Sequence, residues 1–376
     1  MVTPEPAVTE QAQLVPEVST TVADAKGLTT EHAVTIKVLG LGGGGCNAID
    51  RMVEAGLSGV ELYALNTDVQ ALRRLQTENK VQIGVNLTRG LGTGANPNIG
   101  RESAEESREH LAMLLEGADL VFIAVGMGGG TGTGAAAVVA ELARASGALT
   151  IGFVTKPFAF EGRQRMKQAE RGIADLEATV DTLITIPNDR ILKIIEKRTP
   201  LNEAFAYADD VLRQGIQGIS DLITRPGLIN LDFADVKTIM SDAGSAMMGI
   251  GEGSGEHGAA DAAQKAIASP LLETRIEGAR GVIVNITGGT DLSMYEVNEA
   301  AEMISRAVDS EAQIIFGAAI EASMQGKVRV TVLAAGFGSR PHRSGATSSA
   351  STMKFDTIVP VIKDDVEVPA FLRYRG

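Results

Sequence analysis

The stretch Gly126 to Ala137, "GMGGGTGTGAAA", carries six glycines in its first nine residues. It follows the apolar run "LVFIAV" and leads into the helix-forming "AAAVVAELARA". Glycine gives up more conformational freedom on folding than any other residue, so this density needs a compensating interaction. Glycines between a strand and a helix let backbone N–H groups approach an anion, and the helix N-terminus adds partial positive charge. We therefore predict a phosphate-binding loop, with a tight strand-to-helix turn as the alternative.

Two further glycine segments occur earlier, "GLGGGGCNAI" at 40–49 and "GLGTGANP" at 90–97. The first matches G-x-G-x-x-G through Gly40, Gly42 and Gly45, which on its own indicates a dinucleotide-binding oxidoreductase. Several glycine loops at the carboxyl ends of parallel strands instead favour one nucleoside triphosphate held from several sides. Because the sequence contains no G-x-x-x-x-G-K-[ST], backbone amides, helix dipoles and Mg²⁺ must balance the phosphate charge.

Polar side chains near these loops are candidates for direct contacts. The hydroxyls of Thr131 and Thr133 can donate to phosphate oxygens or help to hold a metal ion. In "KPFAFEGRQR", Glu161 can accept from ribose hydroxyls and Arg165 can pair with a phosphate. The alternative for this segment is an exposed charged turn.

The apolar pattern predicts an α/β fold. From about 33 to 195, strands alternate with helices such as 102–117, which indicates a parallel sheet covered on both faces. A long helix is expected over 201–224, where apolar residues recur at spacings of three and four, and a second, smaller α/β unit over about 230–338. The predicted strands lie in "AVTIKVLG", "GVELYALNTD", "ADLVFIAVG", "GALTIGFVTKPF", "VDTLITIPND", "ARGVIVNITGG", "AQIIFGAAIEA" and "KVRVTVLAAGF".

Composition excludes several classes of function. A formal net charge of −13, no Trp and only four Tyr argue against a nucleic-acid partner. No window approaches the roughly 18 continuous apolar residues of a membrane helix, so no membrane insertion is expected. The first residues lack the basic start and apolar stretch of a secretory signal. Cys46 is the single cysteine, so no internal disulfide can form and a reducing cytosol is expected.

The glycine segments occur in order with "NTDVQAL", "PFAFEGRQRM", "IPNDR", "FAYADDVLRQGIQGISDLI" and "NLDFADVKTIMS". In this set of motifs the chain resembles the FtsZ family of the tubulin/FtsZ superfamily, the bacterial cell-division GTPases. The resemblance runs from about 33 to 338 and resumes at "VPAFLRYR". It implies a Rossmann-like GTPase domain that binds GTP or GDP, with Mg²⁺ held through phosphates and water and not by side-chain ligands. The implied organisation is a flexible extension (1–32), a GTP-binding domain (33–202), a central helix and connection (203–229), a C-terminal domain (230–338), a linker (339–363) and a partner-binding peptide (364–376).

The resemblance also implies individual nucleotide contacts. A carboxylate at Asp209 suits guanine, whose N1–H and N2–H₂ form a paired donor edge that adenine lacks. The alternative is a solvated helix residue beside Asp210. Cys46 stands where relatives often have Asn or Gly, so its contact is expected through the backbone. The implied phosphate contacts are Gly43, Gly44, Gly130, Thr131, Gly132 and Thr133, with Arg165 nearby, and the guanine and ribose contacts are Asn47, Glu161, Asn188 and Asp209. Gly45 and Cys46 are further implied nucleotide-binding residues.

An acidic segment, "NLDFADVK", follows the long helix and supplies Asn230, Asp232 and Asp235. Two carboxylates three apart share a helix face, although the same pattern also caps helices. The resemblance implies that this segment positions and polarises the water that attacks the γ-phosphate. About 16 helical residues follow Asp209, which is on the order of 24 Å. The acids are therefore expected to reach the nucleotide of a neighbouring copy, so that hydrolysis requires a head-to-tail filament.

The C-terminal peptide 364–376 offers Val368, Phe371 and Leu372 as apolar anchors. It resembles the FtsZ tail that docks onto membrane tethers and regulatory division proteins, and the alternative is a frayed terminus. The resemblance places the protein in the cytoplasm at the midcell division site. Two rival functions remain open at this point, an NAD-type oxidoreductase and a nucleotide-gated polymer without turnover.

Overall fold

The computed structural model describes residues 34–337, apart from 225–231, 256 and 273–275. The predicted N-terminal extension, linker and C-terminal peptide lie outside the described residues, and so does Asn230. Within the described part of the chain, no helix combines the length and apolar character that crossing a membrane requires.

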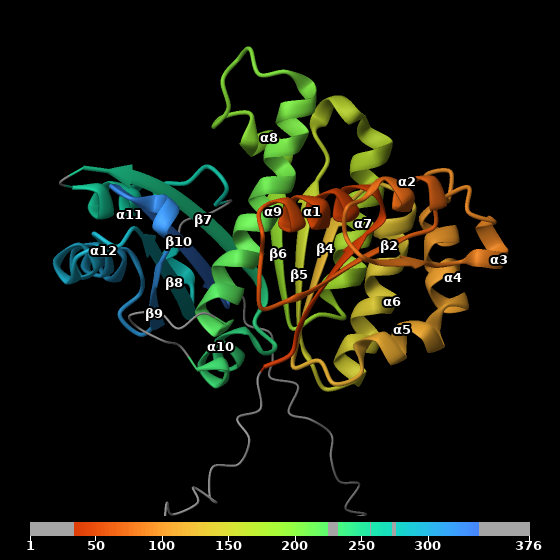
Figure 1. Ribbon diagram of the computed structural model, residues 1–376, viewed down its shortest axis with the longest axis horizontal. Coiled ribbons are helices and arrows are strands. Elements are labelled where there is room, and N and C mark those ends of the chain that lie inside the picture. The colour runs from red at the N-terminus through yellow and green to blue at the C-terminus, as the bar shows by residue number, and fades with distance from the viewer. Residues whose placement is uncertain (1–33, 225–231, 256, 273–275, 338–376) are drawn as a thin grey trace, which may run out of the picture. The chain divides into compact units, whose positions relative to one another are not determined.

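Six parallel strands, in the order β3-β2-β1-β4-β5-β6, form the first part of the sheet (Figure 1). β1 pairs with β2 on one side and β4 on the other, so that Leu41 lies opposite both Leu65 and Val125. Because the strands run in one direction, their carboxyl ends meet at one edge, where loops to the following helices begin. The parallel sheet predicted for this half is confirmed. Its strands are β1 (Ile36–Leu41), β2 (Glu61–Asn66), β3 (Asn79–Gln82), β4 (Leu120–Gly126), β5 (Leu149–Lys156) and β6 (Thr182–Pro187).

Four more strands continue the same sheet in the order β7-β10-β8-β9. β7 runs parallel to β6, with Gly244 opposite Thr182, whereas β10 is antiparallel to both β7 and β8. Among the described residues, one mixed sheet of ten strands therefore passes through both predicted α/β units. These strands are β7 (Gly244–Ser254), β8 (Gly281–Gly288), β9 (Gln313–Ile320) and β10 (Lys327–Ala335).

The sequence pattern does not predict β7, because glycines alternate through it at Gly249, Gly251 and Gly253. A Cβ built on any of the three would lie 2.0 or 2.1 Å from a carbonyl oxygen of helix α11 (Gly258–Ile267). Residues two apart in a strand share one face, so these glycines let α11 pack directly on the strand backbone. Close helix packing, and not strand propensity, explains this composition.

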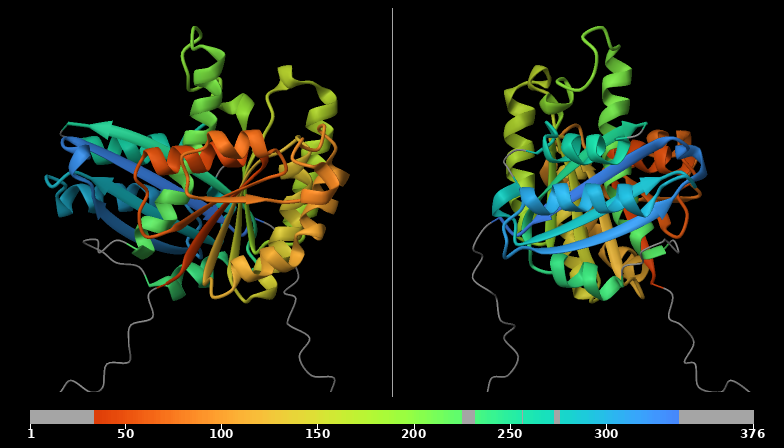
Figure 2. Two further views of the ribbon diagram at one scale, coloured as in Figure 1. Left: turned by 45° about the vertical axis from the view of Figure 1, so that its right-hand side comes forward. Right: turned by 90° about the vertical axis from the view of Figure 1, so that its left-hand side faces the viewer.

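Helices lie on both sides of the sheet (Figure 2). Apolar side chains of α1, α9 and α10 form a core against one face, and those of α5, α6 and α7 form a core against the other. A third core joins α11 and α12 to β8 and β10. The remaining helices are α1 (Gly42–Glu54), α2 (Val69–Arg74), α3 (Val85–Thr88), α4 (Pro97–Glu106), α5 (Arg108–Leu115), α6 (Thr131–Ala145), α7 (Arg163–Glu177), α8 (Asn188–Ile191), α9 (Leu201–Thr224), α10 (Phe233–Met240) and α12 (Met294–Ala307), with 3₁₀ turns at Ala159–Glu161, Ile276–Gly278 and Ala322–Met324.

The helical pattern predicted over 102–117 is present but is divided at Ser107 into α4 and α5. Ser107 has φ −97° and ψ 11°, and its hydroxyl accepts a hydrogen bond from the N–H of Gly84. The preceding Glu106 binds the N–H groups of Asn86 and Leu87. Polar bonds to the N-terminus of α3 thus replace continuation of the helix.

The long helix α9 has the predicted bounds, Leu201–Thr224. Its apolar residues at spacings of three and four, including Val211, Ile216 and Ile219, are buried. In Figure 1, α9 runs from the neighbourhood of α8 to that of α10. This helix therefore fixes how far apart those two ends of the molecule lie.

Candidate functional site

Two glycine loops meet at the carboxyl ends of the neighbouring strands β1 and β4. A Cβ built on Gly132 would lie 2.7 Å from the carbonyl oxygen of Leu41, and one on Gly44 would lie 3.1 Å from the Cα of Gly126. Gly42 also adopts a φ of +68°, which side-chain-bearing residues rarely take. The two backbones are therefore in contact, and any side chain at these positions would separate them.

Packing requires only some of the other glycines in these loops. A Cβ on Gly43 or Gly129 would meet nothing within 4 Å, whereas one on Gly45 would lie 2.2 Å from the carbonyl oxygen of Ala124. Close packing, the alternative considered for the sequence "GMGGGTGTGAAA", thus accounts for part of the glycine content only. The positions that face open space leave the loop backbone accessible to a ligand.

Two helices begin at these loops. α1 starts at Gly42 and α6 starts at Thr131, and neither has a side chain that caps its first turn. The first N–H groups of a helix have no partner within the helix, so both termini offer unpaired donors and partial positive charge. The first turns contain most of the nucleotide contacts predicted in the glycine loops, namely Gly43, Gly44 and Gly45 in α1 and Thr131, Gly132 and Thr133 in α6, with Gly130 at the N-cap of α6.

The two threonine hydroxyls have partners inside the protein. Thr131 and Thr133 are both buried; the Oγ1 of Thr131 lies 2.7 Å from that of Thr67, and the Oγ1 of Thr133 accepts from the N–H of Gly128. These bonds fix the loop that joins β4 to α6. The structure thus gives both hydroxyls a role in shaping the loop, while their backbone N–H groups stay in the first turn of α6.

The third glycine segment, 90–97, packs against the loop that joins β4 to α6. It lies between α3 and α4 and does not directly follow a strand. A Cβ on Gly130 would lie 2.0 Å from the Oγ1 of Thr93, and one on Gly134 would lie 1.9 Å from the carbonyl oxygen of Pro97. The segment therefore packs against the start of α6.

Glu161 and Arg165 form an ion pair, with 3.1 Å between Oε2 and Nε. The other carboxylate oxygen of Glu161 accepts from the N–H of Phe158, and its side chain is 9% exposed while that of Arg165 is 50% exposed. A Cβ on Gly128 would lie 2.7 Å from the Cγ of Arg165. The arginine thus lies against the central glycine loop, although the residues before it, Gly162 to Gln164, are exposed, as the alternative of an exposed charged turn also expects.

Asn188 is the first residue of α8 and directly follows β6. Its side chain is buried, yet its Oδ1 has no hydrogen-bond partner. A buried oxygen without a donor is destabilising, and such groups are rare unless a ligand supplies the partner. The amide of Asn188 is therefore suited to accept from a bound molecule at the edge of the sheet.

Asp209 lies on α9 and faces α1. Its Oδ2 is 3.6 Å from the Nε of Arg51, and its side chain is 15% exposed. Burial raises the pKa of Asp209 to about 7, the guanidinium of Arg51 opposes that rise, and the neighbouring Asp210 adds to it. The carboxylate thus titrates near neutral pH, which the alternative of a solvated helix residue does not explain.

Cys46 and Asn47 point in different directions from the first turns of α1. Cys46 is buried, and its thiol lies 3.5 Å from the carbonyl oxygen of Leu65 and 3.6 Å from that of Gly40. Burial raises the pKa of this thiol to about 12. Asn47 is exposed. The side chain of Cys46 therefore belongs to the core, and only that of Asn47 is open to a ligand.

The predicted acidic residues lie at the far end of α9. Asp232 is the N-cap residue of α10 but makes no capping hydrogen bond, and both it and Asp235 are exposed. The capping alternative is therefore not realised in the structure. From Asp209 to the end of α9 at Thr224 the helix rises about 22 Å, and Figure 1 shows α10 at the end of α9 remote from α8. The structure does not bring these acids together with the glycine loops.

A family model described as the GTPase domain of the tubulin/FtsZ family matches residues 35–196, and one described as the C-terminal domain of the FtsZ family matches residues 244–338. An empty FtsZ dimer from M. jannaschii is 45% identical, with 82% of this chain and 89% of that chain covered and a TM-score of 0.79. The chain belongs to the FtsZ family. A mutant of FtsZ from M. jannaschii is also 45% identical, with 81% of this chain and 91% of that chain covered and a TM-score of 0.78. GDP-bound CetZ1 from Haloferax volcanii shares the fold at 20% identity, with 82% of this chain and 96% of that chain covered and a TM-score of 0.70.

Membership in the FtsZ family decides between the functions that the sequence left open. The chain is a GTPase of the tubulin/FtsZ family and binds guanine nucleotide, as predicted. The dinucleotide oxidoreductase finds no support. The G-x-G-x-x-G match has a packing cause instead, since a Cβ on Gly40 would lie 2.3 Å from the carbonyl oxygen of Gly45.

An aromatic cluster that was not predicted from the sequence lies beside the candidate nucleotide site. The rings of Phe158 and Phe160 stack at 5.1 Å, and that of Phe205 packs edge-on against Phe158 at 5.3 Å. Phe160 is 61% exposed, so the cluster presents an open aromatic surface. Phe205 precedes Asp209 by four residues on α9, a spacing that places both on one helix face and could have predicted the cluster. Arg51, one turn after Asn47 on α1, was missed as well.

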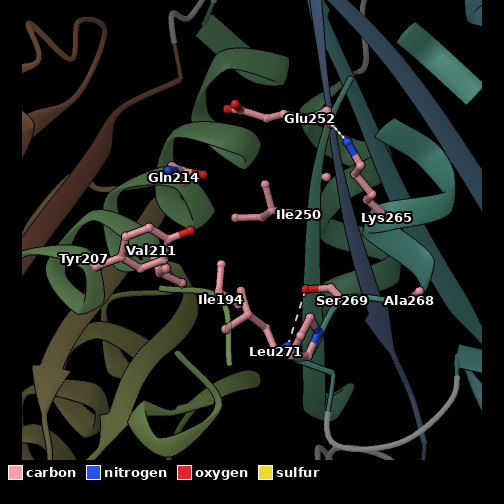
Figure 3. A pocket seen from close by; sticks show the side chains of 12 residues that line it. Ile194, Tyr207, Val211, Gln214, Ile250, Glu252, Lys265, Ala268, Ser269 and Leu271 are labelled. Carbon is pink, nitrogen blue, oxygen red and sulfur yellow. Dashed lines mark hydrogen bonds between the residues drawn. The ribbon is translucent and has the colours of Figure 1, made fainter. Parts of the chain in front are cut away.

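A separate hollow of about 550 Å³ lies between α9 and the pair β7 and α11 (Figure 3). Tyr207 and Gln214 point into it from α9, and Ile250 faces them from β7. It contains none of the sequence-predicted site residues. Since Phe205 and Asp209 alternate with Tyr207 along α9, the candidate nucleotide contacts and this hollow occupy different faces of the helix.

Proposed function

We propose that the chain polymerises head to tail and hydrolyses GTP at the contact between successive subunits. The observation that carries this proposal is the position of Asp232 and Asp235 at the opposite end of α9 from the glycine loops. Neither acid makes a capping bond or an ion pair with the described residues, so both are free to act on a partner. The M. jannaschii relative, described as a dimer, supports self-association.

The nucleotide is held by backbone groups more than by side chains. The N–H groups in the first turns of α1 and α6 bind the phosphates, at Gly43 to Cys46 and Gly130 to Thr133. Arg165 adds a cation beside the loop at Gly128. Mg²⁺, when bound, neutralises the developing phosphate charge, and its ligands are phosphate oxygens and water.

The base and ribose occupy the edge between α1, α8 and α9. The unpaired oxygen of Asn188 accepts a hydrogen bond from a donor of the nucleoside. The carboxylate of Asp209 accepts hydrogen bonds from the N1–H and N2–H₂ groups of guanine. Asn47 and Glu161 complete the polar contacts, and the ring of Phe205 supplies a stacking surface one turn from Asp209.

Hydrolysis then needs two subunits. Asp232 and Asp235 orient and polarise the water that attacks the γ-phosphate bound by the next subunit, together with Asn230, which lies outside the described residues. A contact in which one surface meets a different surface of the next copy need not close, so it propagates as a filament. Loss of the γ-phosphate removes charge at the joint and weakens it, which drives turnover of a division ring.

Residues 364–376 bind division proteins and membrane tethers, and this binding localises the filament to midcell. The support is the resemblance of "VPAFLRYR" to the FtsZ tail together with the apolar anchors Phe371 and Leu372. Deleting 364–376 should leave GTP turnover unchanged and abolish binding to tether proteins. Undiminished tether binding would contradict this assignment.

GTP turnover measured against protein concentration tests the proposed function. Turnover per subunit should be close to zero below a threshold concentration and rise sharply above it, together with light scattering. A monomer that contained the complete reaction centre would instead give the same turnover per subunit at every concentration.

A further inference from the structure

Arg51 and Asp209 face each other across the contact between α1 and α9. The Nε of Arg51 lies 3.6 Å from the Oδ2 of Asp209, within ion-pair distance but too long for a hydrogen bond. That Nε is buried and has no hydrogen-bond partner. Arg51 follows Asn47 by one turn of α1, so the ion pair adjoins a candidate nucleotide contact on the same face of the helix.

The other charges around Asp209 do not replace this cation. Asp210 adjoins it and raises its pKa. The nearby Arg213 is engaged elsewhere, with 2.6 Å between its Nε and the Oδ1 of Asp210 and a further bond to Gln217. Glu54, three residues beyond Arg51 on α1, lines a surface hollow together with Arg51 and Asp210 and adds negative charge there. Among the described residues, Arg51 is the cation in ion-pair contact with Asp209.

We propose that Arg51 is a positioning residue that keeps Asp209 ionised and oriented toward guanine, and so sets the base selectivity and the pH range of nucleotide binding. This inference rests on the proposed contact between Asp209 and the guanine base. An ionised carboxylate accepts the two adjacent guanine donors at once. A protonated one keeps a single good acceptor and turns an O–H donor toward one of these two guanine donors, so one of the two bonds is lost.

Burial brings the pKa of Asp209 close to neutral pH, so the charge of Arg51 affects how much of the carboxylate is ionised there. The pKa of Asp209 is raised to about 7, chiefly by burial, and Arg51 lowers it from what burial alone would give. Removing the guanidinium therefore moves the pKa further up, so that most of the protein carries a neutral Asp209 at pH 7. Raising the pH ionises Asp209 again and should restore nucleotide affinity. A loss of packing would not be reversed by pH in this way.

The test measures dissociation constants for GDP and inosine diphosphate from pH 6.0 to 8.5 by calorimetry, on the full chain. Four proteins are compared: wild type, Arg51→Met, which keeps length without charge, Arg51→Lys, which keeps the charge, and Asp209→Asn. Arg51→Met should bind GDP about fivefold more weakly at pH 7, because a shift of roughly one pKa unit above 7 lowers the ionised fraction of Asp209 from about one half to about one tenth. It should approach wild-type affinity near pH 8.5.

Two further results are expected. Arg51→Lys should follow the wild-type pH profile closely. Arg51→Met should also lose most of the wild-type preference for GDP over inosine diphosphate at pH 7, since inosine lacks the N2 amino group that an ionised Asp209 would engage. The β-phosphate of GDP titrates equally in all four proteins, so ratios between proteins isolate the effect of Asp209.

A constant ratio of Arg51→Met to wild-type affinity at every pH would overturn the proposal, because a merely structural role would give that result. If Arg51→Met loses its structure by circular dichroism, the profile of Arg51→Lys against wild type decides instead, and a lysine variant with an upward-shifted midpoint and no retained selectivity would contradict the proposal. Wild-type GDP binding and selectivity in Asp209→Asn would overturn the guanine contact itself, an outcome distinct from failure of Arg51 alone.

Discussion

A Cβ built on Gly132 would lie only 2.7 Å from the carbonyl oxygen of Leu41, so the loops after β1 and β4 are in direct backbone contact. The same construction at Gly129, three residues earlier, meets open space. Two glycines of one motif therefore have different physical reasons to be glycine. One permits packing between two loops, and the other exposes the loop to a ligand.

Substituting these two glycines should separate stability from binding. Gly132→Ala should lower the free energy of unfolding by about 1 to 3 kcal/mol, the usual cost of forcing a methyl group into packed backbone. Gly129→Ala should leave it unchanged or raise it by up to about 1 kcal/mol, because alanine restricts the unfolded chain. Urea unfolding monitored by circular dichroism measures both. Equal destabilisation by the two variants would show that Gly129 is also a packing position.

Asn188→Ala should weaken GDP binding without destabilising the nucleotide-free protein. Its buried Oδ1 has no partner in the structure, so removing it relieves an unpaired polar group while deleting a ligand contact. The expected loss of affinity is about 1 to 3 kcal/mol. Calorimetric titration with GDP, beside a thermal melt without nucleotide, checks the two halves separately. A variant with wild-type affinity would exclude Asn188 from the site.

Asp209→Asn should change how stability depends on pH. The folded-state pKa of about 7 exceeds the usual 3.8, so between these values the folded protein binds more protons than the unfolded chain. Stability must therefore fall as pH rises through that window. At 1.36 kcal/mol per pKa unit, the wild-type loss between pH 5 and 8 should exceed that of the variant by about 1 to 3 kcal/mol. Parallel stability curves for nucleotide-free protein would show that Asp209 does not titrate near neutral pH.

The glycine loops and the long helix were predictable because their signals are local. Six glycines after an apolar run specify a loop on a sheet edge, and the apolar spacing from 201 to 224 gives the bounds of α9. The strand β7 was not predictable, since its glycines are required by the close packing of the following helix α11 and interrupt the apolar pattern of a strand. Likewise, only the packing of α1 on α9 brings Arg51 to Asp209. What depends on the packing of one element against another needed the structure.

The role of the acidic residues was predictable only in part. The spacing of Asp232 and Asp235 permits a cap as well as a catalytic pair, and the sequence does not choose between them. The structure removes the capping interpretation, because the carboxylate of Asp232 makes no capping bond. It also separates the pair from the glycine loops by most of the length of α9.

The division of the reaction centre between two subunits can be tested with a pair of complementary variants. Asp235→Asn removes an exposed carboxylate and should still fold and bind GTP. Gly129→Glu places a carboxylate at an open position of the loop, where it should repel phosphate without a clash inside the protein. Gly129→Ala is the matched control, because it adds a Cβ at the same position without the charge.

The deciding measurement is phosphate release by these variants alone and mixed. Each alone should hydrolyse GTP slowly, and an equimolar mixture should regain turnover, because GTP held by an Asp235→Asn subunit meets the intact acids of a Gly129→Glu subunit. A mixture no more active than its components would place the acids and the nucleotide within one subunit and contradict the account.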